Sequence, residues 1–289
     1  MLIQDKRYLL NLEQFHGSRG ETLYREAFGR LDGERRRKIV PVKNAAVRAA
    51  SAGAGLLVQK ALWDYISGRR TERFVSERPE IQCFSVEELL AVIGDRAIEP
   101  CYEYGENGKP YLTDYPFHFN LSHSGQYVFL GVSEQEIGVD IQKIQQTDEL
   151  RLAKRFFSGE EYKALEDCKD PENRRQMFFR MWTRKEAYGK LTGQGLAGAI
   201  GKDFWTGYSE ERIFKTKISE VSIPETKFSE ERNMGMEAPI EGIPHIGIPK
   251  SEMSGAKPFG KKLFWEEYDV PPDYQIACVT HFIELADNT

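Results

Sequence analysis

Two long helical stretches, one in each half of the chain, place the strongest constraint on the fold. Residues 46–68, AVRAASAGAGLLVQKALWDYISG, are rich in alanine, repeat apolar side chains at helical spacing and end at a glycine. Asp170 and Pro171 pair a helix cap with a first-turn proline, and they predict a second long helix that runs to about Leu191. We therefore expect one long helix in each half.

Strand-like runs surround both helices. They cover residues 7–15, 117–133 with a polar turn at Ser122–Gly125, 137–144, 213–223, 261–269 and 274–282. Shorter helices are predicted near residues 21–31 and at two capping boxes, Ser85 with Glu88 and Ser158 with Glu161. The chain is therefore predicted to be α+β, with two similar lobes, residues 1–136 and 137–289, each a small, mostly antiparallel sheet packed on a long helix. Residues 222–260, rich in proline and glycine, are predicted to be an irregular insertion.

Composition excludes several classes of protein. The 289 residues are 40% hydrophobic and 29% charged, which is ordinary for a soluble globular protein, and a net charge of -5 does not favour nucleic-acid binding. No apolar run approaches the roughly 18 residues of a membrane span, and early charges argue against a signal peptide. The four scattered cysteines lack metal-ligand spacing and indicate reduced thiols. We expect a cytoplasmic protein without a nucleic-acid or membrane partner.

Positive charge is concentrated in residues 30–48. The basic residues of this run are Arg30, Arg35, Arg36, Arg37, Lys38, Lys43 and Arg48, against only Asp32 and Glu34. Such an excess suits an anionic ligand or an acidic protein partner. On charge alone, a solvated basic face explains it at least as well.

The segment MWTRKEAYGKLTG, residues 181–193, sets Trp182, Glu186 and Lys190 on one i, i+4 row of the second long helix. A surface ion pair between the carboxylate and the ammonium is the simple explanation, and such pairs contribute little to stability. The alternative is that each group serves a bound ligand.

A second carboxylate makes that alternative concrete. Asp140 projects from the predicted strand IGVDIQKI, and oxygen ligands from two separate elements suit a hard cation such as Mg²⁺. Lys185 and Lys190 would then hold phosphate oxygens. Spacing alone leaves this weak, because any acidic residue on a strand can be paired on paper with one on a helix.

Residues 120–124, NLSHS, offer a second polar cluster. Hydroxyls, an imidazole and turn amides can cradle a phosphate, although a turn that satisfies its own backbone is the simpler interpretation. A hydrolytic triad is not favoured, because no Gly-x-Ser-x-Gly motif is present. His118 and His123 are spaced for a metal pair on a helix, whereas this segment is predicted to be strand and turn.

Taken in order, five motifs resemble the 4′-phosphopantetheinyl transferases of the large, single-chain, surfactin-synthetase-activating type. They are GKP (108–110), FNLSHSG (119–125), IGVDIQKI (137–144), RFFSGEE (155–161) and WTRKEAYGKLTGQGL (182–196), with a weaker match from Arg48. The ordered pair GVD and WxxKEAxxK is highly specific, although no single motif is.

The resemblance implies a pseudo-twofold axis between the lobes, with coenzyme A between an N-terminal lobe that contacts it and a C-terminal lobe that carries the Mg²⁺ and catalytic motifs. It implies Mg²⁺-dependent transfer of the phosphopantetheine arm of coenzyme A to a serine of an acidic apo acyl or peptidyl carrier protein, with release of 3′,5′-ADP. A monomer is expected. Such a transfer depends on positioning and charge neutralisation more than on covalent help.

By position, the resemblance also assigns the residues nearest the reaction. Asp140 and Glu186 match the Mg²⁺ carboxylates. Lys190 and the pair Ser122 and His123 match contacts to the pyrophosphate and the 3′-phosphate.

Further coenzyme contacts are implied in the N-terminal half. Lys109 and Pro110 match a loop that touches the coenzyme, and Arg48 matches a further phosphate ligand. Arg35 and Lys38 align more loosely, from the basic run.

One position departs from the family pattern. Many relatives carry glutamate where this chain has Gln142, whose amide can bind Mg²⁺ directly or through a water but cannot accept a proton. The general base would then be Glu186, or Lys185 if its pKa were lowered. Glu161 and Trp182 are interpreted as structural support.

Two alternatives stay open. Gln142 is compatible with a non-catalytic relative that binds carrier protein or coenzyme A. An unrelated Mg²⁺-dependent nucleotide enzyme is less favoured, because the chain has no P-loop and no kinase-like set of motifs.

Overall fold

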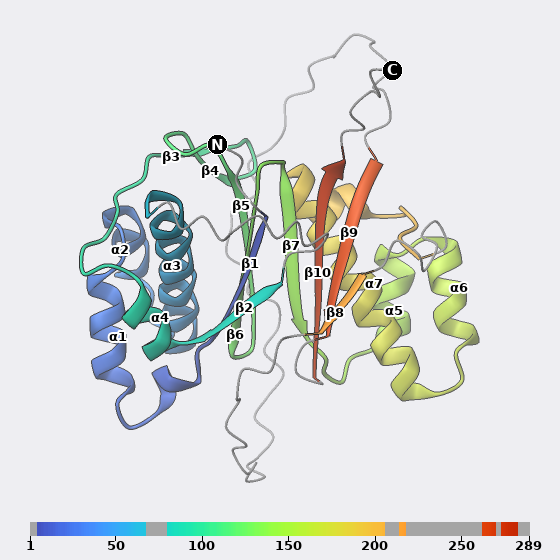
Figure 1. Ribbon diagram of the computed structural model, residues 1–289. Helices are drawn as coiled ribbons and strands as arrows, with labels where there is room; N and C mark the ends of the chain where they lie inside the picture. The colour runs from blue at the N-terminus through green and yellow to red at the C-terminus, as the bar shows by residue number, and fades with distance from the viewer. Residues whose placement is uncertain (1–4, 68–79, 206–213, 218–261, 270–272, 283–289) are drawn as a thin grey trace, which may run out of the picture.

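The computed structural model describes residues 5–67, 80–205, 214–217, 262–269 and 273–282 (Figure 1). The fold is α+β, as the sequence predicted, and strands from both halves lie at the centre with helices on the two outer sides. The predicted insertion, residues 222–260, lies outside the described residues.

The N-terminal lobe is built on a four-stranded sheet in the order β2-β1-β6-β5. Its strands are β1 (Lys6–Asn11), β2 (Ile81–Ser85), β5 (His118–Ser124) and β6 (Tyr127–Ser133). Only β1 and β2 pair in parallel; the other neighbours are antiparallel. The helices are η1 (Glu13–His16), α1 (Gly20–Gly29), α2 (Gly33–Ile39), α3 (Ala45–Ile66) and α4 (Val86–Val92), and a hairpin joins β3 (Tyr102–Tyr104) to β4 (Pro110–Leu112).

The C-terminal lobe repeats this plan with the sheet order β7-β10-β9-β8. Its strands are β7 (Ile137–Lys143), β8 (Phe214–Lys217), β9 (Lys262–Asp269) and β10 (Tyr274–Phe282), of which β8 and β9 pair in parallel. Its helices are α5 (Glu149–Phe156), α6 (Gly159–Asp167), α7 (Pro171–Thr192) and η2 (Leu196–Ala199). Each long helix therefore covers one sheet, as predicted.

The two sheets pack against each other between the helices, in the order α3, N-terminal sheet, C-terminal sheet, α7 (Figure 1). One buried cluster lies between the sheets and joins Leu9 and Phe129 of the first sheet to Val139 and Ile276 of the second. Because β6 is buried along its whole length, its run of apolar residues needs no polar alternation. The contact between lobes is thus a core in its own right.

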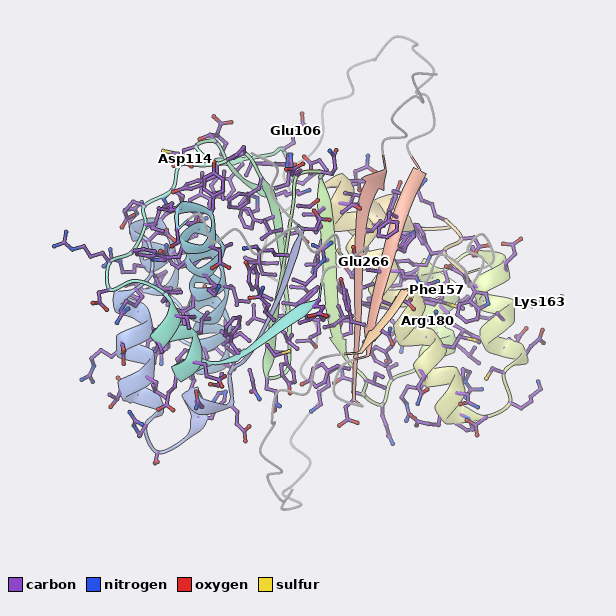
Figure 2. The ribbon with its side chains drawn as sticks, in the orientation of Figure 1. Glu106, Asp114, Phe157, Lys163, Arg180 and Glu266 are labelled. Atoms are coloured by element: carbon purple, nitrogen blue, oxygen red, sulfur yellow. The ribbon has the colours of Figure 1, made fainter. Side chains whose placement is uncertain are left out.

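An ion pair crosses this contact between the lobes. The Arg7 guanidinium donates from Nε and Nη2 to the two carboxylate oxygens of Glu266, each at 2.9 Å, and both side chains are buried. Figure 2 shows Glu266 at the centre of the molecule, where the sheets face each other. A bidentate pair of this kind fixes the orientation of one lobe against the other.

The segment Ser122–Gly125, predicted as a polar turn, is mostly strand, so the position of the predicted turn is wrong. β5 continues through Ser124, and the chain reverses at Gly125, whose φ of 53° falls in the left-handed region that favours glycine. Polar residues at every second position made the segment resemble a turn, but in the fold they share one side of the strand.

That polar side of β5 faces the edge of β7. Asn120 Oδ1 accepts the backbone N–H of Val139 at 2.9 Å, and Ser124 Oγ accepts the N–H of Lys143 at 2.9 Å. Side chains therefore join the two sheets where a backbone ladder is not formed. This seam brings NLSHS against GVD.

Both predicted capping boxes, at Ser85 with Glu88 and at Ser158 with Glu161, are confirmed, as is the start of α7 at Asp170 and Pro171. No secondary structure was predicted for the middle of the basic run, and part of it forms α2, capped by Asp32. None of the helices in the described part of the chain is long and apolar enough to cross a membrane.

Candidate active site

Asp140 is the centre of a polar cluster at the seam between the lobes. Its Oδ1 accepts hydrogen bonds from Ser122 Oγ at 2.6 Å and from Lys190 Nζ at 2.7 Å, and its Oδ2 accepts from Gln142 Nε2 at 3.0 Å. Lys190 also donates to Ser122 Oγ at 2.7 Å. The carboxylate is only 1% exposed, so its charge is held by these three donors.

A close approach of β7 to α7 makes this cluster possible. A Cβ built on Gly138 would lie 2.0 Å from the carbonyl oxygen of Ala187 and 2.5 Å from the backbone nitrogen of Leu191. Glycine is thus the residue that lets strand and helix touch here. The glycine of GVD is as necessary to the site as its aspartate, because it brings the helix that carries Glu186 and Lys190 against the strand that carries Asp140.

Glu186 lies one turn before Lys190 on α7, but the simple ion pair between them is not formed among the described residues, since Lys190 bonds to Asp140. Burial, and secondly the negative charge of Asp140, raise the pKa of Glu186 to about 7, against a smaller opposing effect of Lys190. No hydrogen-bond donor to its carboxylate is found in the described part of the chain. Glu186 is therefore a partly buried carboxylate without a bonded partner, close to a second one.

These groups fit a hard divalent cation. Two carboxylates that repel each other in a buried place are stabilised by a cation between them, and Gln142 keeps its amide oxygen available while its nitrogen bonds Asp140. The described residues hold no cluster of three or more histidine, cysteine and acidic side chains that would suit a metal with an all-protein ligand set. Mg²⁺ does not require one, because it keeps several waters or substrate oxygens.

Ser122 and His123 lie at the same seam but differ in exposure. Ser122 is buried against Asp140, whereas His123 is exposed. Partial desolvation, together with the positive charge of Lys190, lowers the pKa of His123.

A pocket of about 150 Å³ lies in the N-terminal lobe and gathers three of the predicted coenzyme contacts, Arg35, Lys38 and Pro110. Tyr102 and Tyr104, whose rings stack with centroids 6.5 Å apart, line it as well. Asp32 and Glu34 also line the pocket, and Glu34 pairs with Lys38 at 2.9 Å. Arg35, Lys38 and the two rings can therefore hold an anionic aromatic ligand if its phosphate replaces Glu34 as the partner of Lys38. The tyrosines escaped the sequence analysis because nothing in their spacing distinguishes them from core residues.

Arg48 lies elsewhere, in the first turn of α3, with its guanidinium 5.9 Å from the centre of the Tyr24 ring. Among the described residues it contacts neither the Asp140 cluster nor the pocket.

The structure does not bring the ammonium groups of Lys185 and Lys109 to the Asp140 cluster. Lys185 is fully buried on another side of α7, where it pairs with Glu161 at 2.8 Å and donates to the carbonyl of Lys202 at 2.6 Å. Desolvation lowers the pKa of Lys185, but its contacts are those of a residue that holds α6 and η2 against α7. Lys109 Nζ bonds instead to Glu136 at 2.7 Å.

Trp182 and Glu161, interpreted as structural, have structural surroundings. Trp182 stacks on Phe178 with ring centroids 5.7 Å apart and meets Phe156 edge-on. Glu161 closes its capping box at Ser158.

Comparison with known proteins gives matches to one family. Residues 136–229 match the family model described as the 4′-phosphopantetheinyl transferase superfamily. The chain is similar to the 4′-phosphopantetheinyl transferase psf-1 of Bacillus pumilus, with 45% identity over 33% of this chain and 41% of the relative. It is similar to the 4′-phosphopantetheinyl transferase Sfp of Bacillus subtilis strain 168, with 43% identity over 32% and 41% of the two chains. The match to the 4′-phosphopantetheinyl transferase gsp of Aneurinibacillus migulanus is longer, with 30% identity over 53% of this chain and 64% of the relative.

The matched stretches are partial. The chain spans about two fifths of the length of the first of these curated relatives, 41%, and 64% of gsp. The family model begins just before β7 and includes Asp140, Gln142, Glu186 and Lys190, so the matched part contains most of the Asp140 cluster.

Proposed function

We propose that this protein transfers the 4′-phosphopantetheine arm of coenzyme A to a serine of an apo acyl or peptidyl carrier protein, because residues 136–229 match the model of the 4′-phosphopantetheinyl transferase superfamily. The observation that carries the proposal is the buried Asp140 bonded to Ser122 and Lys190, with the unpartnered Glu186 beside it. The other product is 3′,5′-ADP. In the reaction the serine oxygen bonds to the β-phosphorus of coenzyme A while the bond from that phosphorus to the bridging oxygen breaks.

The cluster supports this chemistry through its charges. Asp140, Glu186 and Gln142 are the residues that would hold Mg²⁺, which neutralises the pyrophosphate when bound. Lys190 supplies a positive charge at the same place, and Ser122 and His123 supply hydrogen bonds to phosphate oxygens. Preorganised charge of this kind is the main contribution a protein makes to phosphoryl transfer.

Glu186 is the general base in this proposal. Before a cation binds, burial and the charge of Asp140 raise the pKa of Glu186 to about 7. A bound cation would lower this pKa again, so the Glu186 oxygen that does not hold the cation would accept the proton of the attacking serine, directly or through one water. Gln142 cannot, and the ammonium of Lys185 is held by Glu161 away from the cluster.

The N-terminal pocket is proposed to bind the nucleotide end of coenzyme A. Arg35 and Lys38 would meet phosphate, and the rings of Tyr102 and Tyr104 would pack beside the base. This division supports the predicted domains, with residues 1–136 as the coenzyme-contacting lobe and residues 137–289 as the lobe with the metal and catalytic groups. We propose Arg48 as a more distant phosphate contact, from the family resemblance.

The partner and the setting are also proposals. The exposed basic residues of α2 suit an acidic carrier protein. A cytoplasmic location fits the four scattered cysteines, which indicate reduced thiols. A monomer fits the resemblance to single-chain relatives.

Gln142 favours one second candidate, a relative that binds carrier protein or coenzyme A without transferring the arm. Its amide donates to Asp140, so this position gives the cluster a hydrogen bond where a glutamate would give a third carboxylate beside Asp140 and Glu186. The unrelated nucleotide enzyme finds no support among the comparisons.

The test is the mass of the carrier protein. Purified protein is incubated with an apo carrier protein, coenzyme A and Mg²⁺, and intact mass is measured with and without EDTA. We expect the gain of one phosphopantetheine group, lost with EDTA and lost in Asp140→Ala. Coenzyme A binding without any mass gain across several carriers would favour the non-catalytic relative.

A further inference from the structure

The β3–β4 hairpin of the N-terminal lobe reaches across to the C-terminal lobe and contacts the end of α7. Its tip, residues 105–109, is closed by hydrogen bonds from Gly105 N to Lys109 O at 2.9 Å and from Gly108 N to Gly105 O at 2.8 Å. Figure 2 labels Glu106 at this tip, above the seam between the lobes. The hairpin is therefore a compact element and not a loose loop.

Two side chains of this tip bond to carbonyl groups at the C-terminus of α7. Asn107 Nδ2 donates to Gly193 O at 2.8 Å, and Lys109 Nζ donates to Leu191 O at 3.0 Å. The last carbonyls of a helix lack partners within the helix, and a cation there is also favoured by the helix dipole. The end of α7 is thus capped by the opposite lobe.

Lys109 also holds the beginning of β7. Its ammonium pairs with Glu136 Oε2 at 2.7 Å and donates to Ile137 O at 3.4 Å, and its side chain is only 8% exposed. One ammonium therefore joins the start of the strand that carries Asp140 to the end of the helix that carries Lys190.

The same hairpin lines the N-terminal pocket. Gly108 and Pro110, on either side of Lys109, are among the residues of that pocket, together with Arg35 and Lys38. The hairpin backbone faces the pocket while the Lys109 ammonium faces α7 and β7. A group bound in the pocket is consequently one residue away from the contact that fixes the Asp140 cluster.

We propose that Asn107, Lys109 and Glu136 are positioning residues that lock the catalytic helix and strand to the coenzyme pocket. The inference rests on the proposed transferase function. The expected loop of Lys109 and Pro110 still lies at the pocket, but the Lys109 ammonium already has an anionic partner and two carbonyls and so serves the contact between the lobes. In this arrangement the lysine acts on the reaction only through the elements it joins.

The test compares Lys109→Met, Glu136→Gln, the double variant and Lys109→Arg, with Glu106→Gln as the control that removes the same charge from the exposed hairpin tip. Coenzyme A affinity is measured by calorimetry, and kcat and KM are measured by transfer to an apo carrier protein. Each single variant should lower kcat by about tenfold or more, since a misplacement of 1 Å can cost about 10²-fold. Coenzyme A affinity should change by less than about twofold, the double variant should be no worse than Lys109→Met, and Lys109→Arg should recover part of kcat.

The two roles of Lys109 predict different effects of Lys109→Met on coenzyme A affinity. If Lys109 bound a coenzyme phosphate, Lys109→Met would weaken coenzyme A binding and Glu136→Gln would leave it equal or stronger, because it removes a competing anion. That pattern would overturn the proposal.

A second readout does not depend on the transferase. Amide hydrogen exchange in the last turn of α7 should become faster in Lys109→Met and in Glu136→Gln, and stay unchanged in Glu106→Gln. Faster exchange with no transfer by the wild type would reject the proposed function and keep the lock between the lobes. Unchanged exchange in both variants would reject the lock itself.

Discussion

Replacing Gly138 by alanine tests the central feature of the site, which is the contact between β7 and α7. The added Cβ would lie 2.0 Å from the Ala187 carbonyl oxygen, 2.5 Å from Leu191 N and 2.9 Å from Leu191 Cα. All three are backbone atoms, so no side chain can rotate out of the way. The strand and the helix must separate.

The size of that separation sets the expected effect. Ordinary van der Waals contact begins near 3.4 Å, so a group at 2.0 Å requires a local displacement of more than about 1 Å. Because Asp140 is on one element and Glu186 and Lys190 are on the other, this displacement opens the cluster, and 1 Å of misplacement can cost about 10²-fold in rate. Overpacking of this kind costs about 1–3 kcal/mol of folding stability, which corresponds to a fall in Tm of roughly 2–10 °C.

The assay measures both stability and transfer rate. Tm is measured by thermal unfolding and the transfer rate by intact mass of the carrier protein, for Gly138→Ala and for the control Gly159→Ala. Gly159 has no atom within 4 Å of a built Cβ and begins α6, so its replacement should change neither quantity appreciably. A Gly138→Ala protein with the Tm and rate of the wild type would refute the claim that strand and helix need this glycine, and the Tm result bears on it whatever the protein catalyses.

Four further predictions concern Glu186, Glu266, Gln142 and the basic run. Since the pKa of Glu186 is raised from 4.5 to about 7, the folded protein retains a proton that the unfolded chain releases, and stability falls as pH rises through this window. Without divalent cations, Glu186→Gln should therefore raise Tm at pH 8 and leave it unchanged at pH 4; an equal effect at both would contradict the raised pKa. Glu266→Ala removes the bidentate partner of the buried Arg7 and leaves it only the more distant Asp5 at 3.5 Å, so it should cost about 3–5 kcal/mol in urea unfolding, and a cost below about 1 kcal/mol would show that the pair is unimportant. Gln142→Glu should lower the Mg²⁺ concentration for half-maximal transfer and raise the rate, whereas an unchanged Mg²⁺ titration would show that the amide does not limit the site. KM for the carrier protein should rise with NaCl through the basic run, residues 30–48, and a salt-independent KM would exclude that surface.

The periodic and capped elements could be predicted from the sequence. α3 and α7 were predicted because apolar spacing, Asp170 and Pro171 act locally, and the capping boxes formed for the same reason. The ordered motifs predicted the residues of the candidate site, since a strand that presents Asp140 and a helix that presents Glu186 and Lys190 need only their own periodicity.

Partners across the fold could not be predicted. The alternating polar residues of β5 resembled a turn until the edge of β7 supplied their partners, and nothing in the sequence indicated that Lys109 pairs with Glu136. Tyr102 and Tyr104 joined the pocket only because the hairpin folds beside α2.

The sequence by itself thus determined which chemical groups are present and on which helix or strand each one stands, because caps and periodicity act over a few residues. The tertiary structure alone decided which of these groups meet. Asp140 accepts a hydrogen bond from Lys190, 50 residues away, and Glu186, with its raised pKa, has no ion pair among the described residues. The reason is that Gly138 lets the strand and the helix touch and that burial there changes the energy of every charge.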